Sequence, residues 1–315
     1  MPIKLQVIET VIAFSLLVGI VVVLKQRGLF SREDGVRYSN LMTQLILPAV
    51  IFLQLASNPV SERQFLAVVA MFLAGCASLF MSWVAGKIMN LDSPKLGALM
   101  ITSAFGSSSL LGYSMVAFVF PNNPQAMEDA VLISELGVGL PIFTLCPAIA
   151  MHFGSSKDKP QAGQVLVNYL KSPIFIAVVA GLLASPLHLT VNHPFLAPIV
   201  EALKMAEGAL TFMACLILGI QLNFKAVKNL FGLVLVSAFI QMVMQPYLAA
   251  FLATVFHLSI EQHQVLVLIS LMPSAVLGTV FAARFECDGE TSAALVFANI
   301  LLSIVFIPLI FGLIG

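Results

Sequence analysis

The sequence Gly106-Ser107-Ser108-Ser109-Leu110-Leu111-Gly112 interrupts an otherwise apolar segment, 96–120, near its centre. A second interruption, within the apolar segment 265–285, contains Pro273-Ser274 and then Gly278. Glycine and serine are poor helix formers, and proline removes a backbone donor and clashes with the preceding turn. We therefore predict that each segment is a helix that breaks or kinks here, leaving backbone amides and carbonyls free to face a cavity.

The composition of the whole chain excludes a soluble globular protein. Of the 315 residues, 60% are hydrophobic and only 10% are charged, and the mean hydropathy is +1.03. A typical soluble domain has about 25% charged residues. The 15 basic and 15 acidic residues cancel, so the charge gives no indication of a nucleic-acid partner. We interpret the chain as an all-α polytopic membrane protein.

Ten apolar segments account for most of the chain. A helix needs about 20 apolar residues to cross roughly 30 Å of hydrocarbon. Short loops rich in proline, asparagine and serine separate the segments and leave no room for a soluble domain. We predict ten transmembrane helices, at 7–24, 39–56, 65–88, 96–120, 130–151, 173–187, 197–222, 230–256, 265–285 and 291–314. We also expect Ser172 to cap the sixth helix, since it directly precedes Pro173.

The basic residues predict the orientation, because cytoplasmic loops carry an excess of lysine and arginine. The N-terminus and the loops after even-numbered helices contain only Lys4, Arg63 and Lys204. We therefore expect both termini outside the cytoplasm, in a multi-pass protein of the cell inner (plasma) membrane. The loops after odd-numbered helices contain the other basic residues: Lys25, Arg27, Arg32, Arg37, Lys87, Lys95, Lys157, Lys159, Lys171, Lys225, Lys228 and Arg284.

A weak internal repeat relates the two halves of the chain. At an offset of 167 residues, Pro141 meets Pro308, and the triplet 53–55 meets 220–222. The shared offset divides the chain into two five-helix repeats, 1–151 and 165–315, and an odd number of helices inverts the second repeat. At an offset of 166 residues the matched pairs are Ser108/Ser274, Leu111/Leu277, Gly112/Gly278 and Ala117/Ala283.

Inverted repeats are typical of secondary transporters, which bind substrate near the membrane midplane on interrupted helices. The fourth and ninth helices are the candidates here. In another interpretation, glycine and serine only allow close helix packing and Pro273 is a passive kink. Because the two interruptions occupy equivalent positions of the repeat, we favour a functional crossover.

The order and spacing of several motifs resemble the auxin efflux carrier family, in its bacterial, PIN-like branch. The motifs are Leu47–Phe52, Gly106–Gly112, Leu218–Leu222, Pro273–Asp288, Ser303 and Pro308. The resemblance covers essentially the whole chain. It implies ten helices, a scaffold of helices 1, 2, 6 and 7, and a mobile transport bundle of helices 3–5 and 8–10 in which helices 4 and 9 cross.

Two positions depart from the pattern of this family. Ser107 stands where the family usually has asparagine, and Ser114 stands where it usually has proline. The first break therefore depends on glycine and serine alone, and the identity of the substrate does not carry over from the family.

An ionisable group inside a membrane is a candidate functional residue. Glu135, about six residues into the fifth helix, is the one clear example, and we interpret it as a candidate proton-coupling residue. A structural carboxyl group is the alternative. The interior contains no aspartate pair, and helices three, four and nine lack acidic residues at mid-depth, so no sodium site is evident, although carbonyls and hydroxyls alone can bind Na⁺. We expect no catalytic residues, no metal and no cofactor.

The leading hypothesis is a secondary carrier of the efflux type for a small organic anion such as a carboxylate. Helix ends and freed amides can hold a carboxylate without a buried arginine. A membrane sensor that only binds a ligand and a sodium-coupled symporter of the bile-acid type stay open. The expected partners are the solute and the lipid bilayer, with no nucleic acid, and a homodimer also stays open. The expected substrate-binding residues are Gly106, Ser107, Ser108, Ser109, Gly112, Tyr113, Pro273, Ser274 and Gly278.

Overall fold

The computed structural model describes residues 3–57, 62–121, 123–155, 167, 170–185, 197–221 and 230–315, in which there is no named strand. The elements of the first half are α1 Ile3–Gln26, α2 Arg32–Leu41, η1 Met42–Ile46, α3 Leu47–Ser57, α4 Glu62–Ile88, α5 Ser93–Ala104, η2 Ser108–Gly112, α6 Tyr113–Val119, α7 Pro124–Leu132, η3 Ile133–Gly139 and α8 Leu140–Phe153. The label η marks a π-helical turn. The expected lysines at 157, 159, 225 and 228, and the start of the second repeat at 165, lie outside the described residues.

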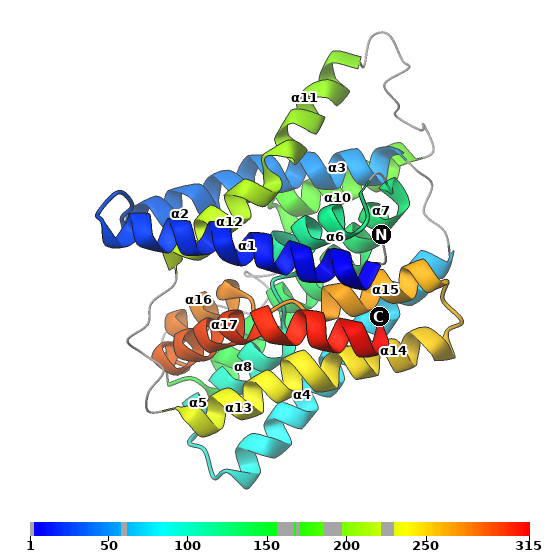
Figure 1. Ribbon diagram of the computed structural model, residues 1–315. Helices are drawn as coiled ribbons and strands as arrows, with labels where there is room; N and C mark the ends of the chain where they lie inside the picture. The colour runs from blue at the N-terminus through cyan, green and yellow to red at the C-terminus, as the bar shows by residue number, and fades with distance from the viewer. Residues whose placement is uncertain are drawn as a thin grey trace.

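The second half continues the all-helical pattern, and the two ends of the chain lie at the same end of the molecule (Figure 1). Near the C-terminus, the carbonyl oxygen of Ile314 lies 2.9 Å from Nε2 of His263. The elements are α10 Pro173–Ala184, α11 Ala197–Gly208, α12 Leu210–Gln221, α13 Phe231–Phe239, η5 Ile240–Met244, α14 Gln245–Val255, α15 Ile260–Ser270, α16 Val276–Arg284 and α17 Gly289–Ile314.

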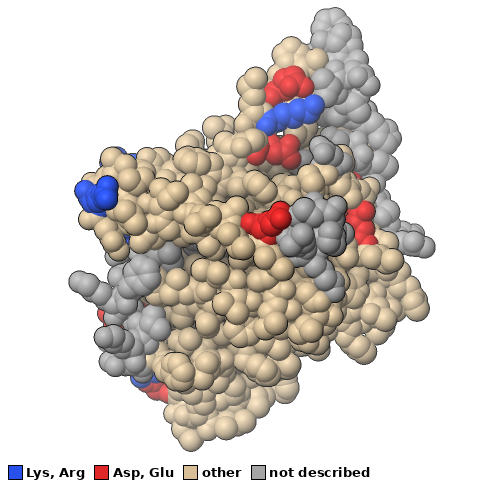
Figure 2. Space-filling model, in the orientation of Figure 1, with Lys and Arg blue, Asp and Glu red and all other residues tan. Residues whose placement is uncertain are grey.

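Five continuous helical stretches of 20 to 30 residues are long and apolar enough to cross a membrane. Many large apolar side chains on them are exposed, such as Leu16, Phe80 and Phe251, as expected of surfaces that face lipid. Figure 2 shows a broad face with very few charged atoms. The prediction of a multi-pass membrane protein is confirmed, whereas ten crossings and an inverted repeat stay predictions. The stretches are Val7–Gln26, Gln64–Ile88, Pro124–Phe153, Phe231–Val255 and Gly289–Ile314.

The helices form two groups that meet along α1 (Figure 1). In one group α3 packs against α10 and α11, while α12 packs against α1 and α2. In the other, α5 packs against α4, α8 and α17, and α14 packs against α4 and α15. Helix α1 also contacts α6 and α17 of the second group. The two groups are therefore joined where α1 packs against α6 and α17, and also where α3 packs against α7 and α12 against η2.

Side-chain caps fix where several helices begin. The hydroxyl of Ser172 accepts a hydrogen bond from the amide of Phe175 at 3.2 Å, which confirms the cap expected there. Asp92 caps α5 in the same way through the Lys95 amide at 3.0 Å, and this bond holds the pKa of Asp92 below its ordinary value. Such caps satisfy amide groups that have no partner within the helix.

Helical structure stops at Phe105–Ser107 and again at Leu271–Ala275. The first interruption is shorter than the seven-residue run that suggested it, because Ser108–Gly112 form the π-helical turn η2. The Ser107 carbonyl accepts hydrogen bonds from the amides of Leu111 at 3.0 Å and Gly112 at 3.4 Å. The second of these bonds spans five residues, which widens the turn at the point where the helix restarts.

Candidate functional site

The two interruptions lie against each other and pair through their backbones. Gly106 and Ser274 form an antiparallel β-bridge. The Ser107 amide donates a hydrogen bond to the Pro273 carbonyl at 2.7 Å. On the other side, the Ala275 amide donates to the carbonyl of residue 105 at 2.8 Å. These bonds satisfy backbone amide and carbonyl groups that have no helical partner at the breaks. They also hold the two segments together inside an apolar protein.

Glycine at position 106 is required by this close approach. A Cβ atom there would lie 2.8 Å from the backbone carbonyl oxygen of Met272, closer than carbon and oxygen atoms can pack. Gly112 and Gly278 also allow close contacts, because a Cβ atom would lie 2.7 Å from Ile269 and 2.8 Å from Ile101 respectively. In these two cases the obstacle is a side chain, which can shift. Gly106 is therefore the position least able to accept a side chain.

Glu135 lies in a buried cluster of hydroxyl groups, which we call the Glu135 cluster. Its Oε1 atom accepts hydrogen bonds from the hydroxyls of Ser109, at 2.8 Å, and Tyr113. The Ser134 hydroxyl donates to the Ser108 hydroxyl at 2.6 Å and lies 3.2 Å from that of Ser109. Two of the π-helical turns, η2 and η3, contribute to the cluster, and such turns are frequent at functional sites. The structure thus places Glu135 beside three of the expected substrate residues.

Ser274 belongs to a second polar cluster, whose hydrogen-bonded side chains differ from those of the Glu135 cluster. Its hydroxyl accepts a hydrogen bond from Nδ2 of Asn299 at 2.7 Å. The same amide group donates to the Ser237 hydroxyl at 2.9 Å, which in turn accepts a bond from Ser103 at 3.1 Å. All four side chains are buried. The two expected serine sites, 108 and 274, therefore share a backbone contact region but bond to different partners.

Sequence reasoning missed several members of these clusters. Ser134 adjoins Glu135 in the sequence, and Ser103 and Ser237 are isolated hydroxyls in apolar helices, which are usually unremarkable. Glu128 and Asp129 are also buried in the long stretch Pro124–Phe153, so Glu135 is one of three buried carboxyl groups there, and its place as the one clear intramembrane ionisable residue stays a prediction. The fifth helix begins at Pro124 rather than near residue 130, so both residues fall inside it.

The electrostatics of the region come from helix ends rather than from charged side chains. Helices α5 and α15 end at Ala104 and Ser270, so their last carbonyl groups point toward the breaks. Helical structure restarts at Ser108 and Val276, where the first amide groups lack helical partners. Carbonyl ends carry partial negative charge and amide ends partial positive charge. The region can therefore accommodate groups of either sign.

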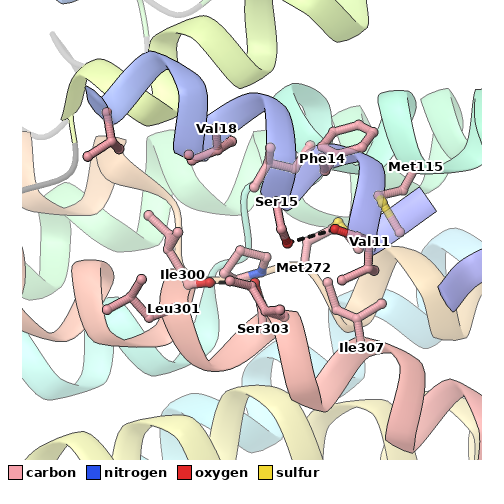
Figure 3. Close-up of a pocket in the computed structure, with 15 residues that line it drawn as sticks. Val11, Phe14, Ser15, Val18, Met115, Met272, Ile300, Leu301, Ser303 and Ile307 are labelled. Atoms are coloured by element: carbon pink, nitrogen blue, oxygen red, sulfur yellow. Dashed lines mark hydrogen bonds between the residues drawn. The ribbon is translucent and has the colours of Figure 1, made fainter. Parts of the chain in front are cut away.

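An apolar cavity of about 230 Å³ opens beside the second break. Figure 3 shows side chains of α1 and α17 facing each other across it. Pro273 and Met272 line it from the break, and Leu111 and Met115 line it from the helix that follows the first break. Its two hydroxyl groups, on Ser15 and Ser303, bond to carbonyls within their own helices, at 2.7 Å in each case. The cavity thus favours an apolar group.

The described residues contain no group of three or more histidine, cysteine, aspartate or glutamate side chains arranged to hold a metal ion. The chemistry that the region offers is hydrogen bonding by hydroxyls, amides and carbonyls, together with apolar contact. These groups can bind and release a solute.

Comparisons with known proteins identify the family to which the chain belongs. A family model described as "Membrane transport protein" matches residues 6–311. An uncharacterized transporter of Methanocaldococcus jannaschii is 24% identical over 288 residues, covering 90% of both chains. An uncharacterized transporter of Methanothermobacter thermautotrophicus is 23% identical over 304 residues, covering 96% of both. Since the family model spans nearly the whole sequence, the chain belongs to the membrane transport protein family of the auxin efflux carriers.

Proposed function

We propose that the protein is a secondary transporter for a small organic anion, a carboxylate, which binds where the two helix breaks meet. The observation that supports this proposal most is the antiparallel pairing of Gly106 with Ser274. It brings together two interruptions that come from opposite halves of the chain and occupy equivalent places in the predicted repeat. Substrate sites of secondary transporters occur at such places.

The carboxylate would be held by amide groups at the restarting helices. The helical residues 108–119 and 276–284 both begin at the paired breaks. Their first amide groups and partial positive charge suit an anion, as they suit phosphate in other proteins. The hydroxyls of Ser107 and Ser108 would add donors, whereas that of Ser109 already donates to Glu135. No buried arginine is needed.

The cavity at Pro273 would take the apolar part of the solute. Its volume of about 230 Å³ is below the roughly 300–1,000 Å³ of sites for drug-sized ligands, so the solute would be small. Its lining by Phe14, Met115 and Ile307 favours a branched or aromatic body. A monocarboxylate with a compact hydrophobic group fits both parts of this site.

Alternating access would arise from movement between the two groups of helices. The repeats are 1–151 and 165–315, with α1, α2–α3, α10 and α11–α12 as the scaffold and α4–α8 and α13–α17 as the transport bundle. The cavity supports this assignment because it lies between α1 of the scaffold and α17 of the bundle. A displacement of the bundle would change which side of the membrane reaches the solute.

Glu135 would couple transport to protons. It bonds to Ser109 and Tyr113, which belong to the helix that restarts after the first break. Loss or gain of a proton at Glu135 would therefore change how this helix is held, and intramembrane carboxyl groups serve as proton relays in other transporters.

Thermal unfolding of the purified protein, followed by counterflow in proteoliposomes, tests the proposal. A panel of aliphatic and aromatic monocarboxylates is compared with the matched neutral amides. We expect a carboxylate to raise the unfolding temperature, since a ligand that binds the folded state stabilises it, and the amide to have no effect. Counterflow of the labelled carboxylate separates a transporter from a sensor. Equal stabilisation by acid and amide would contradict anion recognition, and binding without counterflow would contradict transport.

A further inference from the structure

Gln241 and Gln245 hydrogen-bond to backbone carbonyls at the two breaks, and these bonds fix the orientation of both side-chain amides. Nε2 of Gln245 donates to the carbonyl of Ala104 at 3.0 Å, so Oε1 of Gln245 must face the other way. Nε2 of Gln241 donates to this Oε1 atom at 3.0 Å and to the carbonyl of Met272 at 3.1 Å. Because a backbone carbonyl only accepts, neither amide can be turned over without losing a bond.

This arrangement leaves Oε1 of Gln241 buried with no hydrogen-bond partner. Oδ1 of Asn299 is in the same situation, since both N–H groups of its amide are used on Ser237 and Ser274. Buried acceptors without partners are costly and rare in native proteins. Two of them beside one helix break indicate that a positively charged or donating group belongs there.

Both acceptors belong to one region of the molecule. Gln241 lies one helical turn after Ser237, so the two share a face of the continuous helix α13–η5–α14. Ser237 bonds to Asn299, and α13 and η5 both pack against α17, which carries Asn299. Gln241 bonds to Met272, and Asn299 bonds to Ser274 two residues later. We call Ser103, Ser237, Gln241, Ser274 and Asn299 the Gln241–Asn299 cluster.

The oxygen atoms of this cluster suit a monovalent cation. All are neutral carbonyl or hydroxyl oxygens, whereas Ca²⁺ and Mg²⁺ sites use carboxylates and transition metals prefer nitrogen or sulfur ligands. The carbonyl ends of α5 and α15 add partial negative charge at the same place. Space is limited, because a Cβ atom on Gly106 would lie only 3.2 Å from Nε2 of Gln241. A small ion fits this packing better than K⁺ or an organic cation.

We propose that the Gln241–Asn299 cluster binds Na⁺, with Oε1 of Gln241 and Oδ1 of Asn299 as ligands, with the Ser274 hydroxyl and the backbone carbonyls of the second break completing the site, and with Ser237 orienting Asn299. The ion would bridge helix α13–η5, helix α17 and the segment 272–274. Coupling of this ion to the solute rests on the proposed function. Occupancy of the site does not, and it can be measured without any solute.

The test measures thermal unfolding and ²²Na⁺ binding of the purified protein in NaCl, KCl or choline chloride at equal ionic strength. We expect Na⁺ alone to raise the unfolding temperature. Ser237→Ala removes a hydroxyl that orients Asn299. It should weaken Na⁺ binding by about 10- to 100-fold, which is the usual effect of removing a residue that hydrogen-bonds to an ion ligand and orients it. Ser78→Ala is the matched control, because Ser78 is a buried serine whose hydroxyl donates to the carbonyl of Ala74, 3.0 Å away in its own helix.

Asn299→Asp separates an ion site from a structural cluster. The carboxylate keeps an oxygen toward the ion and adds a negative charge, so it should tighten Na⁺ binding, whereas Asn299→Leu should abolish it. Equal unfolding temperatures in the three salts would overturn the proposal. So would a sodium effect that is the same in Ser237→Ala, Asn299→Asp and the parent protein. If the Na⁺ site is overturned but a carboxylate still raises the unfolding temperature in choline chloride, the proposed function remains supported.

Discussion

Gly106 and Ser274 are paired in an antiparallel β-bridge, although they come from different halves of the chain. The pairing joins two breaks that would otherwise expose unsatisfied backbone groups inside an apolar protein. Ser108, which follows the first break, belongs to the Glu135 cluster, and Ser274, in the second break, belongs to the Gln241–Asn299 cluster. The bridge is thus the structural centre from which both polar clusters are positioned.

Gly106→Ala should separate the paired segments. The new methyl group would lie 2.8 Å from the Met272 carbonyl oxygen, and a backbone atom cannot move aside as a side chain can. We expect transport to fall at least tenfold with a lower unfolding temperature, since clashes of this kind cost about 1–3 kcal/mol. Gly312→Ala is the control, because a Cβ atom there meets nothing within 4 Å. Equal transport by both variants would show that the close approach is not required.

Cysteine labelling tests the predicted orientation. In a background without the four native cysteines, a cysteine at Ser156 should react from the cytoplasmic side and one at Asn123 from the outer side. The physical reason is the concentration of lysine and arginine in loops after odd-numbered helices. Reversed accessibility, or reaction of both from one side, would contradict the ten-helix inverted repeat.

The sequence predicted the features of the fold that depend on local chemistry. Hydropathy located the five long apolar helical stretches, the Ser172-Pro173 pair marked the start of α10, and Pro273 lies inside a break between α15 and α16. The exact extent of the first break was not predictable. Whether Ser108 is helical depends on its accommodation in a π-helical turn, and no propensity scale encodes this.

The candidate site was only partly predictable for a related reason. Glu135 stood out because a carboxyl group in an apolar run is unusual. Ser103, Ser237 and Gln241 did not, since single hydroxyls and amides in membrane helices commonly bond within the bundle. Their significance depends on which helices are neighbours and on which atoms remain unpaired, and a single sequence contains neither kind of information.

Glu135→Gln should remove the dependence of uptake on a pH gradient. The amide keeps an oxygen that accepts from Ser109 and Tyr113, but it carries no exchangeable proton for coupling. Exchange of substrate across the membrane should persist. Uptake in proteoliposomes with and without an imposed pH gradient measures this, with Glu201→Gln as the control, since Glu201 is exposed and paired with Lys204 at 3.3 Å. Unchanged pH dependence in an active Glu135→Gln protein would make Glu135 a structural residue.

Gly19→Leu should narrow the range of accepted solutes. Gly19 lines the cavity, yet a Cβ atom there meets nothing within 4 Å, so the larger side chain can occupy the cavity without displacing neighbours. We expect affinity for carboxylates with bulky apolar groups to fall about tenfold while the smallest carboxylates bind as before, since losing about 1.4 kcal/mol of apolar contact has this effect. Inhibition of counterflow by a size series measures it. A uniform loss across the series would place the apolar group elsewhere.

The last prediction concerns the paired breaks themselves. Ser108→Leu and Ser274→Leu each remove a buried hydroxyl and add bulk where two segments approach closely, so solute binding should fall while insertion into the membrane remains intact. Ser108→Ala and Ser274→Ala separate the two effects, since they remove only the hydroxyl. Pro273→Ala should slow transport for another reason. A residue with an amide hydrogen allows the helix to continue, so the backbone groups that would hold the solute pair with one another instead. Binding is measured by the thermal shift with the best carboxylate, and insertion by the yield of monodisperse protein. If both leucine variants and Pro273→Ala fold and transport at the parental rate, the solute does not bind at the breaks, and the polar residues of α2–α3 and α12 become the place to search.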